Sequence, residues 1–136
     1  MDFKNKTALI TGSGQGVGRG IALALSGHGA NVALVGRTLS KVESVAEEIN
    51  SKGGSAIAIE CDVKHKDSIQ SAVELTISKF SSINFLVNNA QEVPLGNLLQ
   101  VSEESYEAGW LSGPMATFRF MRMCHPHLKG GGKIIN

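Results

Sequence analysis

The chain has 136 residues, of which 42% are hydrophobic and 18% are charged, and its formal net charge at pH 7 is +1. This length and hydrophobic content are sufficient for one folded domain with a buried core, and they exclude disordered and fibrous proteins. The near balance of acidic and basic residues creates no strong electrostatic field, so neither nucleic acid nor an anionic membrane is expected as a partner.

Apolar runs alternate with amphipathic segments along most of the chain. Short, mostly apolar runs bounded by glycines or polar residues are typical of strands buried on both faces of a sheet. Apolar residues that recur three and four positions apart are typical of helices that cover such a sheet. The predicted elements are a strand over residues 6–11, a helix over 17–28, a strand over 31–35, a helix from 40 to the glycines at 53 and 54, a strand over 55–60, a helix over 67–80 and a strand over 83–87.

Polar residues mark the starts of the predicted helices. The segment Ser40–Glu43 has the spacing of a capping box, and Asp67 is suited to cap the helix that follows it. Ser102 can cap a long helix predicted over about 103–128. The glycine triplet after this helix ends it, and a last strand is predicted to begin at Lys133.

The alternation of strands and helices predicts the fold class. Strand–helix–strand units of this length form right-handed crossovers, which make neighbouring strands parallel and place helices on both faces of the sheet. We therefore predict an α/β fold, a Rossmann-type doubly wound parallel sheet of about five strands flanked by helices. Because no internal repeat or linker interrupts the pattern, we interpret residues 1–136 as one domain.

A glycine-rich turn, Thr11–Gly18, lies between the first strand and the first helix. In a doubly wound sheet this is where a phosphate meets a helix N-terminus. Gly12 permits a sharp exit from the strand, Gly16 lets the backbone approach a diphosphate, and Gly18 lets the helix pack closely on the strand. The alternative is a turn without a ligand. The predicted cofactor-binding residues here are Gly12, Ser13, Gly14, Gln15, Gly16, Val17 and Gly18, with the amides of Ser13, Gln15 and Val17 as donors.

This turn, together with Asn88-Asn89-Ala90 after the fourth strand, resembles the pattern of the short-chain dehydrogenase/reductase family. The resemblance spans the chain and includes Cys61-Asp62-Val63 and the final Gly132–Asn136, which is similar to the family strand that leads to a catalytic serine. It implies that the Asp62 carboxylate accepts from the adenine amino group, that Val63 packs on that ring, that Asn89 and Ala90 line the ribose, and that Asn88 ties the central strands together. From the residues alone, Asp62 can equally be a loop cap before the next helix.

The end of the second strand bears on the choice of cofactor. In Rossmann sheets an acidic residue there binds the ribose hydroxyls of NAD, whereas a nearby arginine accommodates the extra phosphate of NADP. Here Gly36 takes the place of the acid, and Arg37 can offer a charge-assisted pair of donors to a phosphate. We predict NADP(H), with NAD(H) as the alternative if Arg37 is only a solvated or adenine-stacking side chain.

The resemblance implies an oxidoreductase that moves a hydride between the cofactor and a small carbonyl or alcohol substrate. It also implies a serine and a Tyr-x-x-x-Lys pair, but the only tyrosine, Tyr106, is not followed by a lysine four positions on. We therefore predict no catalytic residue within the chain, which looks C-terminally truncated relative to the family and is expected to bind a dinucleotide without reducing a carbonyl. The alternative from another class is a catalytically silent nucleotide-binding or regulatory module.

Two positions depart from the family pattern. Gly113 takes the place of an asparagine that, in the family, helps to hold a water linking the lysine to solvent; the neighbouring Pro114 is expected to kink the helix. Either the proton relay is altered, or backbone carbonyls freed by the proline hold an equivalent water. Gln91 stands where the family usually has glycine, and it either shapes the substrate pocket or points into the loop toward Pro94.

The resemblance also implies a homodimer or homotetramer. In the long helix, Tyr106 and Trp110 lie one turn apart and are interpreted as packing residues. The pattern does not separate core from subunit contact for Phe118, Phe120 and Met121.

The cysteines and the N-terminus predict a reducing compartment and no metal site. Cys61 and Cys124 form no disulfide framework, and Cys124, His125 and His127 do not converge as metal ligands because residues two apart on a helix point in different directions. A strand pattern begins too close to Met1 for a signal peptide, and no apolar stretch has the length of a membrane span. We expect a cytoplasmic location.

Overall fold

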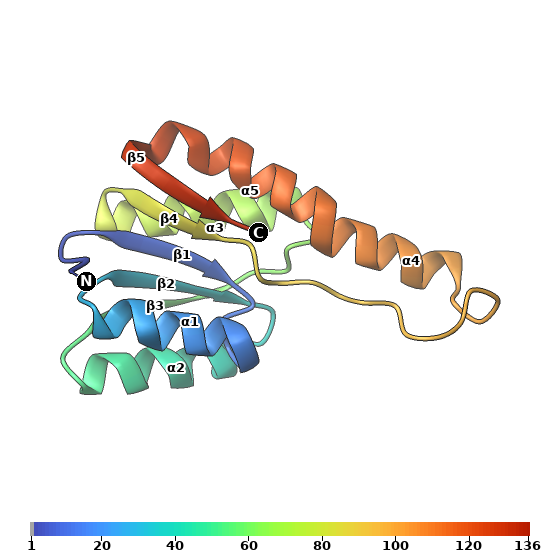
Figure 1. Ribbon diagram of the computed structural model, residues 1–136, viewed down its shortest axis with the longest axis horizontal. Coiled ribbons are helices and arrows are strands. Elements are labelled where there is room, and N and C mark those ends of the chain that lie inside the picture. The colour runs from blue at the N-terminus through green and yellow to red at the C-terminus, as the bar shows by residue number, and fades with distance from the viewer. Residues whose placement is uncertain (1) are drawn as a thin grey trace.

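The chain forms one parallel sheet of five strands in the order β3-β2-β1-β4-β5 (Figure 1). The computed structural model describes residues 2–136, and of Lys129 and Gly130 it describes only the backbone. All four neighbouring strand pairs are parallel, so the predicted doubly wound sheet is confirmed. The strands are β1 Thr7–Thr11, β2 Asn31–Gly36, β3 Ser55–Glu60, β4 Ile83–Val87 and β5 Leu128–Ile135.

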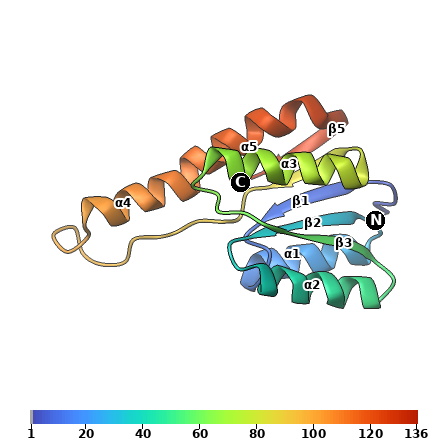
Figure 2. The ribbon, with the colours of Figure 1, turned by 180° about the vertical axis from the view of Figure 1, so that it is seen from behind.

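Helices cover both faces of the sheet (Figures 1 and 2). Helices α1 and α2 lie on one face, and α3 and α5 lie on the other, while α4 extends beyond the sheet beside the connection that follows β4. None of the helices described between residues 2 and 136 is long and apolar enough to cross a membrane. The helices are α1 Gly16–Gly27, α2 Leu39–Ser51, α3 Lys66–Phe80, α4 Glu103–Trp110 and α5 Ala116–Cys124.

Strand β1 is the centre of the molecule, because it pairs with β2 on one side and with β4 on the other. Its side chains alternate between two cores: Ile10 packs with the residues of α1 and α2, and Leu9 packs with those of α3 and α5. All five of its residues are buried. The chain reverses its direction of travel across the sheet at β1 and β4, and in open parallel sheets a ligand crevice forms beyond the carboxyl ends of such strands.

Two of the predicted helix caps are wrong. Helix α2 begins earlier than Ser40, with Thr38 as the N-cap residue, and α3 begins before Asp67, with His65 as the N-cap residue. Neither cap makes a side-chain hydrogen bond to its helix. Asp67 instead lies in the first turn of α3, where the partial positive charge of the helix N-terminus favours a carboxylate.

The long helix after Ser102 is confirmed, but its middle turn is irregular. The Ser102 hydroxyl accepts a hydrogen bond of 3.1 Å from the Ser105 amide, as expected of an N-cap. The turn Leu111–Met115 between α4 and α5 is π-helical and contains Pro114, which has no N–H to donate to the preceding turn. A 3-10 turn over His125–His127 ends the helical segment.

The last strand begins earlier than predicted, at Leu128 instead of Lys133. Leu128 is opposite Ile83, and Lys133 is opposite Phe85. The register of β5 against β4 therefore shifts between these two pairs, and the glycines lie in the extra residues of β5. Gly131 has a φ of 84°, a conformation that suits glycine. The prediction that the glycines end the helix is therefore wrong, because the helical segment ends at His127 and the glycines lie inside β5.

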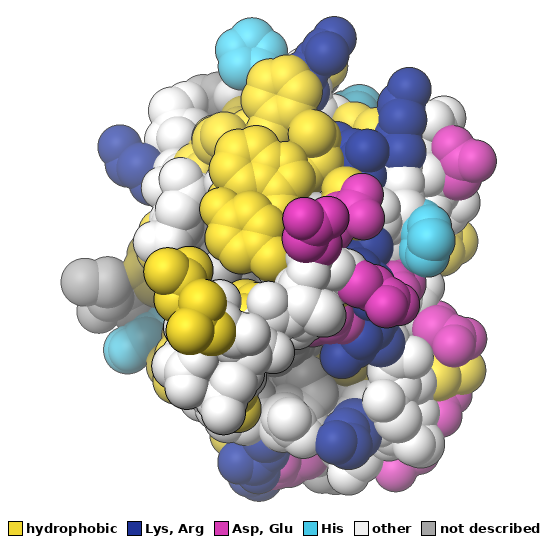
Figure 3. Space-filling view, turned by 90° about the vertical axis from the view of Figure 1, so that its right-hand side faces the viewer, with side chains coloured by type: hydrophobic (Ala, Val, Ile, Leu, Met, Phe, Trp, Pro, Cys, Tyr) yellow, Lys and Arg dark blue, Asp and Glu magenta, His cyan; other side chains and the backbone are white. Residues whose placement is uncertain are grey.

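The large hydrophobic side chains of the long helix fall into a buried and an exposed group. Phe120 is buried in the core, whereas Tyr106, Trp110 and Phe118 are 65%, 52% and 49% exposed. The interpretation of Tyr106 and Trp110 as packing residues is therefore wrong for the described chain. Figure 3 shows hydrophobic side chains gathered on the face of the molecule that lies at the α4 end.

Candidate functional site

A pocket of about 450 Å³ lies beyond the carboxyl ends of β1 and β4, where the direction of the chain reverses. Its walls come from the turn after β1 and from the segments that follow β2, β3 and β4. Ten of the twelve predicted cofactor-binding residues line it: Gly12, Gly14, Gln15, Gly16, Val17, Arg37, Asp62, Val63, Asn89 and Ala90. Ser13 and Gly18 do not.

The first turn of α1 presents free backbone donors to this pocket. Gln15 is the N-cap residue, and the Arg19 amide donates to the Gln15 carbonyl at 3.2 Å. The amides of the three residues in between therefore have no partner within the helix. A Cβ built on Gly16 would meet nothing within 4 Å, so the space beside this backbone is open. Such an N-terminus is suited to bind an anion.

Gly12 and Gly18 bring the start of α1 against the end of β1. A Cβ on Gly18 would lie 2.3 Å from the Gly12 carbonyl oxygen and 2.6 Å from Asn89 Nδ2, so only glycine fits there. Gly12 has a φ of 65°, which lets the chain turn sharply out of the strand. These contacts agree with the roles predicted for the two glycines, a sharp exit and close packing.

Ser13 has a different role from the one predicted. It is fully buried, and its amide and hydroxyl both donate to the Val35 carbonyl, at 3.2 Å and 3.4 Å. Ser13 therefore offers neither group to the pocket, because both tie the turn to the end of β2. Of the three expected amide donors, Ser13, Gln15 and Val17, the first is therefore removed.

The Thr11 hydroxyl holds the segment after β4 against the turn, a role that sequence reasoning missed. It accepts hydrogen bonds of 2.9 Å from the amides of both Asn89 and Ala90, and it donates to the Val87 carbonyl at 3.4 Å. The Asn89 carboxamide donates back to the carbonyls of Thr11 and Gly12, at 3.0 Å and 3.2 Å. Two walls of the pocket are thus fixed relative to each other.

Asn88 and Asn89 make hydrogen bonds that differ from the expected ones. Asn89 both lines the pocket and joins β1 to β4. Asn88 instead joins β4 to β5, because its amide donates to the Ile135 carbonyl at 2.9 Å and its carboxamide donates to Asn136 Oδ1 at 2.8 Å. The tie between the central strands, expected of Asn88, is therefore made by Asn89.

Asp62 makes a turn contact and also lies at the pocket. Its Oδ1 accepts from the Lys64 amide at 3.0 Å, which is the turn role, and the residue lines the pocket beside the nearly buried Val63. The preceding Cys61 also lines the pocket. Burial, reinforced by the neighbouring Asp62 carboxylate, raises the pKa of the Cys61 thiol, so this group stays protonated and weakly nucleophilic.

Charged side chains at the rim of the pocket are the main feature that the sequence did not reveal. The Glu92 carboxylate pairs with the Arg37 guanidinium and also with Lys64 Nζ, the latter at 3.1 Å. Lys41 Nζ donates to Gln15 Oε1 at 2.7 Å beside the glycine turn. The sequence could have indicated Lys41 as a residue of the site, because it lies near the start of the helix that follows Arg37.

The two departures from the family pattern meet in space. Gln91 lines the pocket, and a Cβ built on the buried Gly113 would lie 3.0 Å from Gln91 Nε2. The Gln91 carboxamide therefore occupies the space that a side chain at position 113 would need. This placement agrees with the interpretation that Gln91 shapes the pocket rather than pointing into the loop toward Pro94.

The cysteine and histidines at the end of α5 do not form a cluster. Cys124 is buried, and burial raises the pKa of its thiol to about 12, whereas His125 is exposed. Within residues 2–136, no three or more histidine, cysteine or acidic side chains are grouped so that they could hold a metal ion.

Comparison with known proteins gives a family. A family model described as short chain dehydrogenase matches residues 6–136. The chain is 36% identical to 12α-hydroxysteroid dehydrogenase of Clostridium sp., over an alignment that covers 98% of this chain and 55% of that protein. It is 32% identical to a probable tetrahydroxynaphthalene reductase of Zymoseptoria tritici, over 96% of this chain and 49% of that protein.

Solved structures agree with this result. A dehydrogenase/reductase from Sinorhizobium meliloti superposes with a TM-score of 0.93 at 30% identity, covering 98% of this chain and 53% of that one. A 7α-hydroxysteroid dehydrogenase, solved with NADH and 7-oxo glycochenodeoxycholic acid, superposes with a TM-score of 0.92 at 27% identity, covering 98% and 52%. The chain thus spans about half the length of these relatives.

The close approach at Gly18 generates a prediction about stability. Gly18→Ala forces a methyl group against the backbone oxygen of Gly12, which cannot move without disturbing β1, so we expect a loss of about 1–3 kcal/mol in the free energy of unfolding. Gly20→Ala is the matched control in the same helix, because a Cβ there meets nothing within 4 Å; it should raise stability by up to about 1 kcal/mol. Denaturant unfolding of the full chain measures both, and equal effects would contradict the packing role of Gly18.

The two buried threonines of β1 give a second prediction. Thr11→Val removes the acceptor of two amides and should lower the free energy of unfolding by about 2 kcal/mol. The Thr7 hydroxyl is buried and has no hydrogen-bond partner among the described residues, so Thr7→Val should leave stability unchanged or raise it. Thermal unfolding of the two variants checks this contrast. A Thr11→Val protein as stable as the parent would show that the threonine does not hold the loop.

Proposed function

This chain belongs to the short-chain dehydrogenase family, and from that premise we propose that its pocket binds NADP(H) for hydride transfer to or from a small carbonyl or alcohol substrate. The observation that carries the proposal is the helix N-terminus at the glycine turn, which opens directly into the pocket.

The residues of the pocket fit a dinucleotide. The amides of Gly16 and Val17 have no partner within α1, and the missing side chain at Gly16 leaves room for the diphosphate to approach them. Lys41 lies close to this turn through its hydrogen bond to Gln15, so it adds positive charge on the same side. We propose that these groups hold the diphosphate.

The adenosine half of the cofactor is proposed to lie between the ends of β2 and β3. Asp62 has a carboxylate oxygen besides the one bound to the Lys64 amide, and Val63 supplies an apolar surface for a ring. Arg37 would bind the 2′-phosphate, and Asn89 and Ala90 would border a ribose.

The packing at Gly36 supports NADP(H) over NAD(H). A Cβ at this position would lie only 2.9 Å from Cγ1 of the fully buried Val42. An acidic side chain that could bind the ribose hydroxyls would therefore have to displace a core residue of α2. With glycine at the end of β2, Arg37 is the side chain after this strand that is suited to contact the 2′-phosphate of the cofactor.

A bound nicotinamide cofactor would donate or accept the hydride. We propose that the groups which transfer the proton and hold the substrate carbonyl are contributed from outside residues 1–136, and that this chain alone binds the cofactor without turnover. The names of the matched relatives, a hydroxysteroid dehydrogenase and a tetrahydroxynaphthalene reductase, support a substrate with a hydroxyl or keto group.

The exposure of the large hydrophobic side chains Tyr106, Trp110 and Phe118 supports a homodimer or homotetramer, which we retain as part of the proposal. A cytoplasmic location stays a prediction.

Titration of the full chain with NADPH and NADH by calorimetry tests the cofactor assignment. We expect NADPH to bind about 10-fold or more tightly than NADH, because Arg37 makes a charge-assisted contact only with the 2′-phosphate. Arg37→Glu should abolish this difference by weakening NADPH binding alone. Lys6→Glu, which makes the same change of charge at the exposed residue just before β1, should leave both affinities unchanged.

Equal affinities for the two cofactors in the parent protein would refute the preference for NADP(H). Failure of both to bind at millimolar concentration would refute the nucleotide-binding function itself.

A further inference from the structure

Glu92 occupies an unusual position for an acidic residue, at the rim of a pocket proposed to receive a phosphate. Its carboxylate is shared by two cations, Arg37 from the segment after β2 and Lys64 from the segment after β3. The side chains of Glu92 and Lys64 are 30% and 24% exposed and so are partly shielded from water, whereas that of Arg37 is 57% exposed. A single exposed ion pair contributes little, but a carboxylate held by two cations at once, one of them the partly buried Lys64, is restrained.

The backbone around the cluster is also fixed. The Glu92 amide donates to the Ser112 hydroxyl at 2.8 Å, which ties this residue to the π-helical turn between α4 and α5. The Lys64 carbonyl accepts from the Arg119 guanidinium at 2.9 Å, which ties the other side of the cluster to α5. The three charged side chains therefore connect the segments after β2, β3 and β4 across the mouth of the pocket.

Resting on the NADP(H) function above, we propose that Glu92 is an internal competitor of the cofactor's 2′-phosphate, so that its charge sets how strongly the site prefers NADP(H) over NAD(H). A carboxylate and a phosphate use the same planar set of guanidinium donors. Arg37 cannot give its full set to the phosphate while Glu92 holds part of it. In addition, Glu92 would lie near the bound phosphate as a like charge.

As a consequence, Glu92 keeps the preference of the site for NADP(H) over NAD(H) below the level that Arg37 could give without it. Binding of a 2′-phosphorylated nucleotide must break or share the Arg37–Glu92 pair, whereas binding of NAD(H) leaves the pair intact. Lys64 limits the effect, because it keeps a positive partner for Glu92 after Arg37 has turned to the phosphate. Neutralising Glu92 should therefore strengthen the binding of 2′-phosphorylated ligands selectively.

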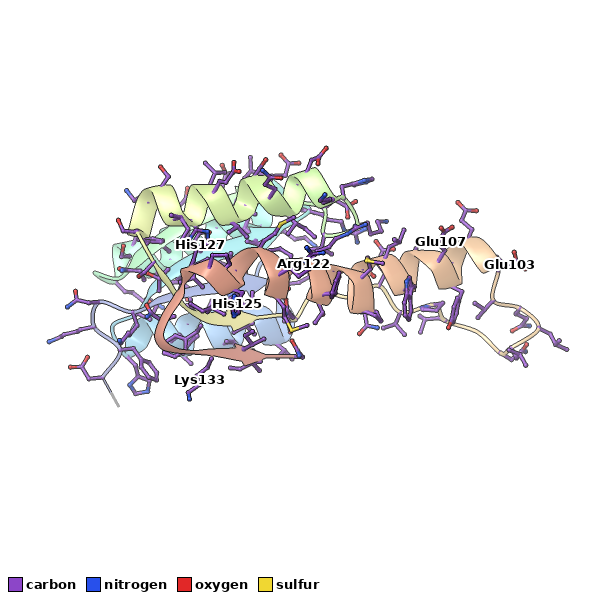
Figure 4. The ribbon with its side chains drawn as sticks, turned by 90° about the horizontal axis from the view of Figure 1, so that it is seen from above. Glu103, Glu107, Arg122, His125, His127 and Lys133 are labelled. Atoms are coloured by element: carbon purple, nitrogen blue, oxygen red, sulfur yellow. The ribbon has the colours of Figure 1, made fainter. Side chains whose placement is uncertain are left out.

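Calorimetric titration of the full chain and its Glu92→Gln variant with NADP+, NAD+ and adenosine 2′,5′-bisphosphate tests this inference. We expect Glu92→Gln to bind NADP+ and the bisphosphate about 5- to 10-fold more tightly, which is the effect of removing one nearby charge at a partly shielded site, and to bind NAD+ with unchanged affinity. Glu103→Gln removes the same charge at the far end of α4 (Figure 4) and should change none of the three affinities.

A double-mutant comparison identifies Arg37 as the partner. In an Arg37→Gln background the further change Glu92→Gln should strengthen NADP+ binding clearly less than it does in the parent, because the competed donor is gone and only the like-charge repulsion is relieved. Thermal unfolding of each variant, compared with the parent, ensures that affinities are read from folded protein.

The inference is overturned if Glu92→Gln leaves NADP+ binding unchanged, weakens it, or strengthens NAD+ binding equally. Each of these results can occur while the parent still binds NADP+ preferentially, and the proposed function would then stand without the competitor role. If the parent binds none of the three ligands, the proposed function fails first, and that result is visible before any variant is made.

Discussion

The site depends on one steric constraint, the contact between Gly18 at the start of α1 and the carbonyl of Gly12 at the end of β1. No side chain fits between them, because a Cβ on Gly18 would lie 2.3 Å from that oxygen. This approach places the unpaired amides of the helix N-terminus beyond the carboxyl end of the central strand. Because β4 lies beside β1, the Asn89 carboxamide reaches the same carbonyl and closes the arrangement.

Around this contact, the pocket is assembled from loops that are far apart in the sequence but follow neighbouring strands. Hydrogen bonds to the Thr11 hydroxyl connect the first and fourth of these loops, and ion pairs with Glu92 connect the second, third and fourth. The first set is neutral and centres on the buried Thr11, so it serves rigidity. The second set is charged and partly exposed, so it can respond to an anionic ligand.

The elements of the fold were predictable because each is encoded by a local pattern. The strands β3 and β4 match the predicted ranges 55–60 and 83–87, since buried apolar runs between turn residues leave little freedom in their limits. The caps at Ser40 and Asp67 were not predictable in the same way. A capping bond contributes about 1 kcal/mol, which is less than burial of the stripe Val42, Val45 and Ile49 against the sheet.

The sequence by itself determined the alternation of strands and helices, the glycine turn, and the presence of Arg37 where an acid is absent. These features are local, because they follow from side-chain period and backbone freedom over a few residues. The tertiary structure decided that Ser13 bonds to Val35, that Gln91 fills the space beside Gly113, and that Glu92 faces Arg37. Such contacts join residues from separate loops, and their geometry follows from how the loops pack at the edge of the sheet, which no local pattern encodes.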